Sequence, residues 1–344
     1  MSEDILVFDA DSIAYKASSA SETKTICTQR IEKGVIEHWD NRTAFRAFLK
    51  DTPYTEDMYT ITDVQEARHS SYGKSLIREM IKGYHNRTGV SKGEIYISGA
   101  DNFRDSLPLP AEYTVTIGKW AGISTLGGRY KSNRDGNIRP LQLKELRHYM
   151  ITDLGAVVVN GMEVDDKSSI RAYEGYKNKT RVIQVTSDKD ALQCTGWLWN
   201  PDKSKKPELI TGFGELHKDG KTIKGTGRMF LYYQALYGDK VDGYHACDLW
   251  KMEQDRLGKT ATFGEVTAYN LLKDCKNDKE AWTALHRQYE NWYPEPVIYA
   301  AWDGIIHTKD SVDLMQLYFN CAFMLRWEGD SVNCREVLSK YGII

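Results

Sequence analysis

The sequence predicts an α/β fold with a mostly parallel central sheet flanked by helices. Four short runs rich in apolar and β-branched residues are typical of buried strands. Stretches with helical spacing separate these runs, which favours parallel pairing of the strands. A chain of 344 residues is long enough for one large domain with a smaller one attached.

Each of the four predicted strands leads into acidic residues. The strands cover residues 5–8, 95–98, 157–159 and 182–185, and the acidic residues after them are Asp9, then Asp101, then Glu163, Asp165 and Asp166, then Asp188 and Asp190. In a parallel sheet the ligand site lies beyond the carboxyl ends of the strands, so we expect these carboxylates to gather at one edge. Clustered like charges repel, so we also expect a cation among them, and oxygen ligands favour Mg²⁺ or Mn²⁺.

The first half of the chain also contains helical patterns and one long irregular segment. Helices are expected over residues 11–20, 43–49, 72–84 and 140–150, and alternation over residues 25–39 around Lys33 and Gly34 predicts a hairpin. Residues 105–137 are rich in Gly and Pro. An interruption of this length between two strands is typically functional or mobile.

A change of character after residue 199 predicts a domain boundary. Residues 200–228 are polar and rich in Lys and Gly, whereas the chain beyond them has mostly helical patterns. The expected helices cover residues 229–237, 262–272, 280–292 and 311–327, and the first of them ends at Gly238. We therefore divide the chain into a core of residues 1–199 and a mostly helical region of residues 200–344.

Composition excludes several classes of protein. Hydrophobic content of 41% and charged content of 27% are ordinary for a soluble globular protein. No apolar stretch reaches the length of a membrane span and the acidic start does not resemble a signal sequence, so we expect a cytoplasmic protein without a membrane partner. The six cysteines show no CxxC spacing, which predicts reduced thiols and no zinc site.

Nucleic-acid binding would depend on local basic surfaces, because a net charge of −2 gives no global attraction to phosphates. Residues 129–147 contain six basic residues against two acidic ones, and residues 203–228 contain seven basic residues among glycines. Either stretch is also compatible with an ordinary solvated surface. The candidate DNA contacts in and near the first stretch are Arg104, Arg129, Arg139 and Lys144.

Acidic residues at close spacing add to the metal hypothesis. Glu163, Asp165 and Asp166 would cap a helix start, but three acidic residues in four positions exceed what a cap requires. Asp188 and Asp190 would point to one face of an extended segment, a spacing that suits a shared ion. A fifth acidic element, residues 238–243, contains Asp239 and Asp242 between glycines, and taken alone it reads as a surface turn.

Residues 130–134 supply the opposite charge. A phosphodiester hydrolase needs cations for the scissile phosphate and a planar group for an unstacked base. Lys131 and Arg134 could meet the first need and Tyr130 the second. Without this context, the segment reads as an exposed helix start.

The order of these motifs resembles the 5′-nuclease superfamily. The motifs are Phe8-Asp9-Ala10-Asp11, Phe103-Arg104, Tyr130-Lys131-Ser132-Asn133-Arg134, Glu163-Val164-Asp165-Asp166, Ser187-Asp188-Lys189-Asp190 and Gly238-Asp239-Lys240-Val241-Asp242. The superfamily includes bacteriophage 5′–3′ exonucleases, flap endonucleases and the 5′-nuclease domain of bacterial DNA polymerase I. The chain is most similar to T7-type phage exonucleases, and the resemblance extends from about residue 5 to 265.

The resemblance implies a PIN-like fold and a metal-dependent 5′–3′ exonuclease or flap endonuclease that acts in phage-type DNA replication or recombination. Its partners would be DNA with a free 5′ end and replication proteins, and its location the host cytoplasm. Two Mg²⁺ or Mn²⁺ ions are implied, one held by Asp9, Asp101, Glu163 and Asp165 with Asp166 adjacent, the other by Asp188, Asp190, Asp239 and Asp242. Lys131, Arg134 and Tyr130 would act from a helical arch within residues 104–150.

The resemblance also implies a helix–turn–helix-like element over residues 238–270 that grips duplex DNA through main-chain amides and K⁺. Gly258 and Lys259 would make those contacts, although residues 244–251 separate them from the acidic turn by more than the family pattern does. Three other functions stay open. They are a haloacid-dehalogenase-type phosphatase with Asp9 as nucleophile and Asp11 as general acid, a non-catalytic nucleic-acid-binding relative, and a nuclease that cuts RNA.

Overall fold

The computed structural model describes residues 4–32, 34–117, 122–220 and 222–344. The chain divides into two compact units that interleave along the sequence. The first, here called the sheet unit, contains the chain up to Asp9, then Thr88–Asn137 and Val158–Ile344, and the second, called the insert unit, contains Ala10–Arg87 and Ile138–Val157. The boundary predicted at residue 200 therefore does not coincide with this division.

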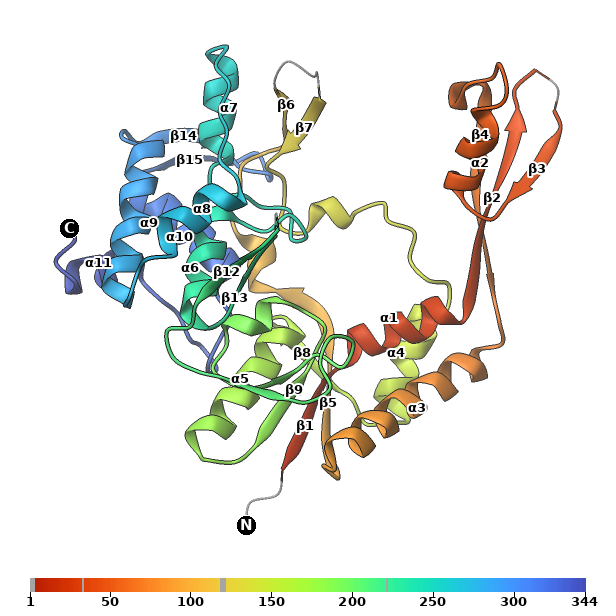
Figure 1. Ribbon diagram of the computed structural model, residues 1–344, viewed down its shortest axis with the longest axis horizontal. Helices are drawn as coiled ribbons and strands as arrows, with labels where there is room; N and C mark the ends of the chain where they lie inside the picture. The colour runs from red at the N-terminus through yellow and green to blue at the C-terminus, as the bar shows by residue number, and fades with distance from the viewer. Residues whose placement is uncertain (1–3, 33, 118–121, 221) are drawn as a thin grey trace. The chain divides into compact units, whose positions relative to one another are not determined.

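The sheet unit is built on a six-stranded sheet in the order β11-β10-β9-β1-β5-β8 (Figure 1). β1 pairs in parallel with β5 and β9, β9 pairs in parallel with β10, and β11 is antiparallel to β10. This arrangement confirms the predicted α/β fold with a mostly parallel sheet. The strands are β1 (Ile5–Asp9), β5 (Lys92–Asn102), β8 (Val157–Gly161), β9 (Val182–Val185), β10 (Gly196–Trp199) and β11 (Glu208–Ile210).

Burial explains which strands the sequence predicts well. Every residue of the central strands β1 and β9 is buried, as their continuous apolar runs indicate. The edge strand β8 leaves Val157 and Val158 exposed, so the prediction of a buried strand there is wrong. The helix α5 (Val164–Lys177) packs on β9, β10 and β1, and at Gly175 a Cβ would lie 2.5 Å from Val182.

The segment between β5 and residue 137 contains a hairpin and no α-helix among its described residues. It comprises η2 (Phe103–Ser106), β6 (Tyr113–Ile117) antiparallel to β7 (Gly122–Leu126), and η3 (Ser132–Arg134). The predicted helical arch is therefore wrong for this segment. The hairpin lies beside α7 (Asp248–Arg256), where the Tyr113 hydroxyl donates to Asp255 at 3.3 Å.

Helices form most of the rest of the sheet unit. The buried helix α6 (Gly227–Tyr237) packs against α8 (Glu265–Leu272), α9 (Asp278–Trp292) and α10 (Ser311–Ala322), and α11 (Cys334–Lys340) packs on α10. Three of these helices confirm the predictions closely, but α10 ends five residues early because residues 323–325 turn inward, as described below. Elements missed from the sequence are α7 and the hairpins β12 (Leu216–Asp219)–β13 (Thr222–Gly225) and β14 (Val297–Ala300)–β15 (Ile306–Lys309).

Among its described residues, the insert unit contains four α-helices, one short 3₁₀ helix and a small antiparallel sheet in the order β3-β2-β4. The elements are α1 (Ala10–Ala20), β2 (Glu22–Arg30), β3 (Ile36–Trp39), α2 (Arg42–Leu49), η1 (Glu56–Met58), β4 (Tyr59–Ala67), α3 (Ser70–Thr88) and α4 (Leu143–Thr152). The predicted hairpin is confirmed, with Lys33 outside the described residues, whereas β4 was not predicted. Ile26, Phe45 and Tyr59 form the core of the small sheet.

Across the described ranges, the helices are all too short or too polar to traverse a lipid bilayer.

Candidate active site

Three neighbouring elements of the sheet unit bring carboxylates together at one edge of the sheet. Asp9 is the last residue of β1, whose neighbour Phe8 pairs with Val185 of β9. Asp188 follows three residues after Val185, and Asp165 lies in the first turn of α5. This is the edge that the strand pattern predicts.

A threonine that the sequence did not indicate connects the Asp165 carboxylate with the backbone of Asp188. The Thr186 hydroxyl donates to Asp165 Oδ1 at 3.4 Å and accepts the Asp188 backbone N–H at 3.0 Å. The Asp188 carboxylate in turn accepts the Asp190 N–H at 2.9 Å. Thr186 is buried directly after β9, so its position beyond a strand end was the available signal.

The electrostatics reveal two overlapping acidic groups. Burial raises the pKa of Asp165 well above its ordinary value, and the negative charges of Asp9, Asp188 and Glu163 raise it further. Burial is also the main reason why the pKa of Asp190 is raised well above its ordinary value, and the negative charges of Asp188, Asp239 and Asp242 raise it further. Asp188 is common to both groups. The two groups contain the predicted ligands other than Asp101 and Asp166, with Asp188 also in the first group, but no three described His, Cys, Asp or Glu side chains stand at positions that would hold a metal ion.

Basic side chains already contact these acidic groups. The Lys131 ammonium contacts Glu163 and lies 3.8 Å from Asp242 Oδ1, and Arg134 donates to the same Asp242 oxygen at 2.6 Å. Lys189 lies 2.6 Å from Asp239 Oδ2. Burial alone would lower the pKa of Lys131, but Glu163 and Asp242 outweigh it and raise that pKa. These ammonium groups therefore occupy carboxylate oxygens that a divalent cation would also use.

The acidic turn at residues 239–242 holds its two aspartates by hydrogen bonds within the protein. Asp239 and Tyr244 exchange two backbone hydrogen bonds of 2.8 and 3.1 Å, and the Val241 N–H donates to Asp239 Oδ1 at 2.7 Å. Gly238 begins the turn with φ +100°, where a Cβ would lie 2.3 Å from the Tyr244 carbonyl oxygen. Lys240 and Val241 are exposed, so the turn does reach the surface, but both of its aspartates are buried.

Residues 130–134 are hydrogen-bonded to this turn. Tyr130 is 2% exposed, its hydroxyl donates to Asp242 Oδ2 at 2.7 Å, and the Lys131 N–H donates to the Asp242 carbonyl at 2.8 Å. Asn133 Nδ2 donates to the Lys240 carbonyl at 2.8 Å. Tyr130 is thus enclosed and offers no face to a nucleobase, which corrects its predicted stacking role.

Arg104 and Asp166 form a buried ion pair instead of surface contacts. Arg104 is 1% exposed and Asp166 is fully buried, with Nη1···Oδ2 2.5 Å and Nη2···Oδ1 3.0 Å. The same guanidinium donates to the carbonyls of Cys321 and Phe323, while Asp166 accepts the Leu325 N–H at 3.1 Å. These bonds explain the early end of α10. They leave Arg104 out of reach of DNA and use Asp166 within the protein, which corrects both predicted roles.

Asp101 does not join the acidic groups. It lies on β5, which extends to Asn102, and its exposed carboxylate accepts the Gly161 N–H at 3.2 Å. The charges that raise the pKa of Asp165 are those of Asp9, Asp188 and Glu163. The structure therefore does not place it with the first predicted ligand set.

The backbone N–H groups of residues 258 and 259, which were predicted to contact DNA, form hydrogen bonds within the protein. The Gly258 N–H donates to the Asp255 carbonyl at 2.9 Å and the Lys259 N–H to the Gln254 carbonyl at 2.8 Å. With Gly258 at φ +69°, these bonds cap the end of α7. The predicted amide contacts with DNA are corrected accordingly. The Lys259 side chain is exposed and lines a groove of about 380 Å³ together with Lys240 and Lys251.

The remaining predicted residues either have partners of their own or belong to the insert unit. Arg129 pairs with Asp135 at 3.2 Å in the sheet unit. Arg139 and Lys144 are exposed in the insert unit. Asp11 of α1 forms an ion pair with Arg147 of α4, which does not favour the phosphatase interpretation because a general acid must be available to its substrate.

Comparisons with known proteins add little to this description. No model of a known protein family matches the chain. No sequence among curated proteins matches it. One solved structure, described as the T5 D15 protein co-crystallised with metal ions, is similar over 98% of this chain and 97% of its own, with 14% identity and a TM-score of 0.43. That degree of likeness carries no argument about function.

Proposed function

We propose that this protein is a divalent-metal-dependent phosphodiester hydrolase that cuts DNA at or near a free 5′ end, as an exonuclease or flap endonuclease. The two overlapping groups of buried and half-buried carboxylates support this proposal most strongly. Keeping buried carboxylates ionised side by side is costly, and divalent cations would offset that cost. A protein that only binds phosphates would gain nothing from an acidic pocket, which favours a hydrolase over a binding protein.

The donor chemistry of both groups fits a hard cation, because every donor is a carboxylate oxygen. Asp9, Glu163, Asp165 and Asp188 would hold one ion. Asp188 with Asp190, Asp239 and Asp242 would hold the other. When bound, such ions lower the pKa of water and stabilise charge on the leaving oxygen.

The basic residues at the site would bind and orient the phosphate. Lys131 and Arg134 contact carboxylates at the rim of the site, so a phosphate that enters there meets their positive charges. Tyr130 would act as a positioning residue, because its hydroxyl holds Asp242. Lys131 adopts the left-handed conformation at φ 60°, which its N–H bond to the Asp242 carbonyl helps to maintain.

The groove beside α7 would receive the duplex backbone. Lys240, Lys251 and Lys259 line it, together with hydroxyl side chains from Ser124, Thr260 and Thr262. Lysine side chains would therefore make the phosphate contacts, since the amides of residues 258 and 259 are already bonded. A bound K⁺ at this turn stays a prediction.

The test uses end-labelled blunt duplex and 5′-flap DNA incubated with Mg²⁺ or with EDTA. We expect products with a 5′-phosphate in Mg²⁺ and none in EDTA. The variant Asp188→Asn keeps the oxygen that accepts the Asp190 N–H but removes a charge common to both acidic groups, so it should lose hydrolysis and retain DNA binding. The exposed Asp274→Asn serves as the matched control. Full activity of Asp188→Asn, or hydrolysis that persists in EDTA, would contradict the proposal.

A further inference from the structure

One basic turn has no role in the site described so far. It covers residues 200–207, here called the lysine turn, and carries Lys203, Lys205 and Lys206 between Pro201 and Pro207. We propose that the lysine turn binds the phosphate backbone of a nucleic-acid strand next to the carboxylate site. This inference rests on the proposed function, since it names a further contact surface for the same substrate.

The lysine turn is held rigidly. The carbonyl of Asn200 accepts the N–H groups of Lys203 at 3.2 Å and Ser204 at 2.9 Å, and its Oδ1 accepts the Asp202 N–H at 3.1 Å. The indole of the buried Trp199 donates to the Ser204 carbonyl at 3.1 Å. A preordered backbone reduces the entropy lost when the lysines bind a ligand, which distinguishes this turn from a flexible basic loop.

Its anchor lies directly beside the acidic residues. The turn leaves β10 at Trp199, whose carbonyl accepts the Thr186 N–H at 3.2 Å. Asn200 Nδ2 donates to the carbonyl of Ser187, the residue before Asp188, at 3.4 Å. Two strand spacings of about 4.8 Å separate β10 from β1, so the turn begins roughly 10 Å from the end of β1. With a rise of about 3.4 Å per base pair along the duplex axis, that distance corresponds to about three base pairs.

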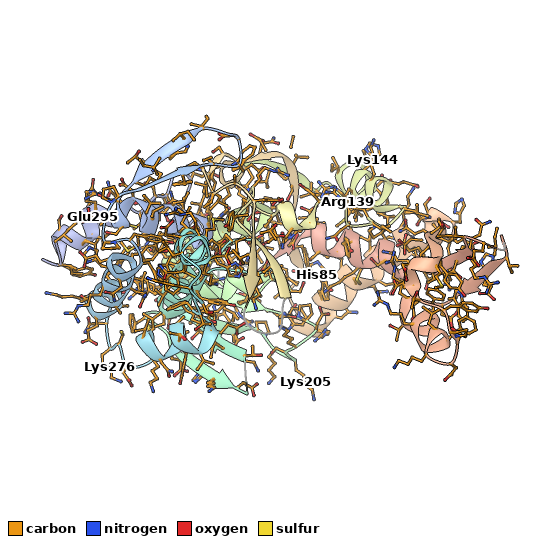
Figure 2. All side chains as sticks on the ribbon, turned by 90° about the horizontal axis from the view of Figure 1, so that it is seen from above. His85, Arg139, Lys144, Lys205, Lys276 and Glu295 are labelled. Carbon is orange, nitrogen blue, oxygen red and sulfur yellow. The ribbon has the colours of Figure 1, made fainter. Side chains whose placement is uncertain are left out.

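The charges of the lysine turn are available to a ligand. All three lysines are exposed, and Figure 2 shows Lys205 projecting from the ribbon. Across the described residues they form no ion pair, whereas Lys131, Arg134 and Lys189 at the site itself all contact carboxylates. A polyanion that approaches an acidic edge needs unpaired cations at the rim, and the lysine turn provides three.

The experiment measures how salt affects the binding of a fluorescein-labelled DNA duplex with a single-stranded 5′ extension, in EDTA so that no cleavage occurs. The full chain is compared with a triple variant, Lys203→Ala, Lys205→Ala and Lys206→Ala. The slope of log K against log salt concentration should become shallower by about 0.9 for each lysine that contacts a duplex phosphate, or up to about 2.7 for three. Replacing the same three lysines with arginine should restore the slope.

A matched control removes three exposed lysines, Lys273 and Lys276 between α8 and α9 and Lys279 in the first turn of α9 (Figure 2 labels Lys276). This control should leave the slope unchanged, and a thermal melt checks that each variant is folded. An unchanged slope in the lysine-turn variant, or an equal change in the control, overturns the inference. If the full chain cleaves DNA but the salt slope of the lysine-turn variant equals that of the full chain, only this inference fails. If the full chain neither binds nor cleaves DNA, the proposed function fails as well.

Discussion

Replacing Asp248 with asparagine should stabilise the protein at neutral pH. Asp248 is buried at the start of α7, where its Oδ2 accepts the Gly127 N–H at 3.2 Å and its Oδ1 has no hydrogen bond. His245 Nδ1 lies 3.7 Å from Oδ1, but burial lowers the pKa of His245 to about 4, so the imidazole is uncharged at neutral pH. Among the described residues, Asp248 therefore has no charged partner at hydrogen-bond distance. Asparagine has the same shape without the charge.

The size of the effect follows from the pKa of Asp248. Burial raises it from 3.8 to about 6, although Lys251 acts in the opposite direction. Because the folded state holds the proton more tightly than the unfolded state, the free energy of unfolding decreases as pH rises from about 4 to about 6. At about 1.4 kcal/mol per pKa unit, the loss reaches about 3 kcal/mol above pH 7 and is about 1 kcal/mol at pH 4.5.

The assay is urea unfolding of both proteins between pH 4.5 and pH 8, followed by tryptophan fluorescence. The stability advantage of Asp248→Asn should grow by about 2 kcal/mol across this range. Taking the difference between the two proteins removes the contributions of groups that titrate equally in both. A constant difference, or one that shrinks toward pH 8, would refute the reasoning.

Three further predictions concern stability and turnover. Arg104→Met should lower the free energy of unfolding by about 3–5 kcal/mol because it leaves Asp166 buried and unpaired. Adding Asp166→Leu should recover part of that loss. If urea unfolding shows that the losses of the two substitutions simply add, this reasoning is wrong. Gly238→Ala should destabilise the protein by about 2 kcal/mol or more, because φ is +100° and the added Cβ meets a backbone oxygen. Gly83→Ala, within α3, places its Cβ in open space and should stabilise the protein by about 0.5–1 kcal/mol in the same urea unfolding assay. Lys131→Ala should reduce kcat by about tenfold or more while Kd for DNA changes by less than about threefold; equal changes would leave Lys131 as a phosphate contact only.

Local sequence patterns determined the elements whose environment is uniform. The continuous apolar runs of β1 and β9 predicted central strands because both faces of such strands are covered. Helical periodicity followed by Gly238 predicted the end of α6. The position of acidic residues after parallel strands indicated one edge for Asp9, Asp165 and Asp188, because strand direction alone fixes where such residues emerge.

Tertiary structure decided what individual side chains do. Arg104 and Tyr130 both looked like surface residues that contact DNA, yet each is buried by partners about 60 to 220 positions away in the chain. β10 and β11 were missed because they are only four and three residues long, too short for a strand pattern to stand out in the sequence. The sequence by itself thus determined which residues follow each central strand. Only the tertiary structure decided which charged side chains are buried and which groups they pair with, because burial depends on contacts between segments far apart in sequence.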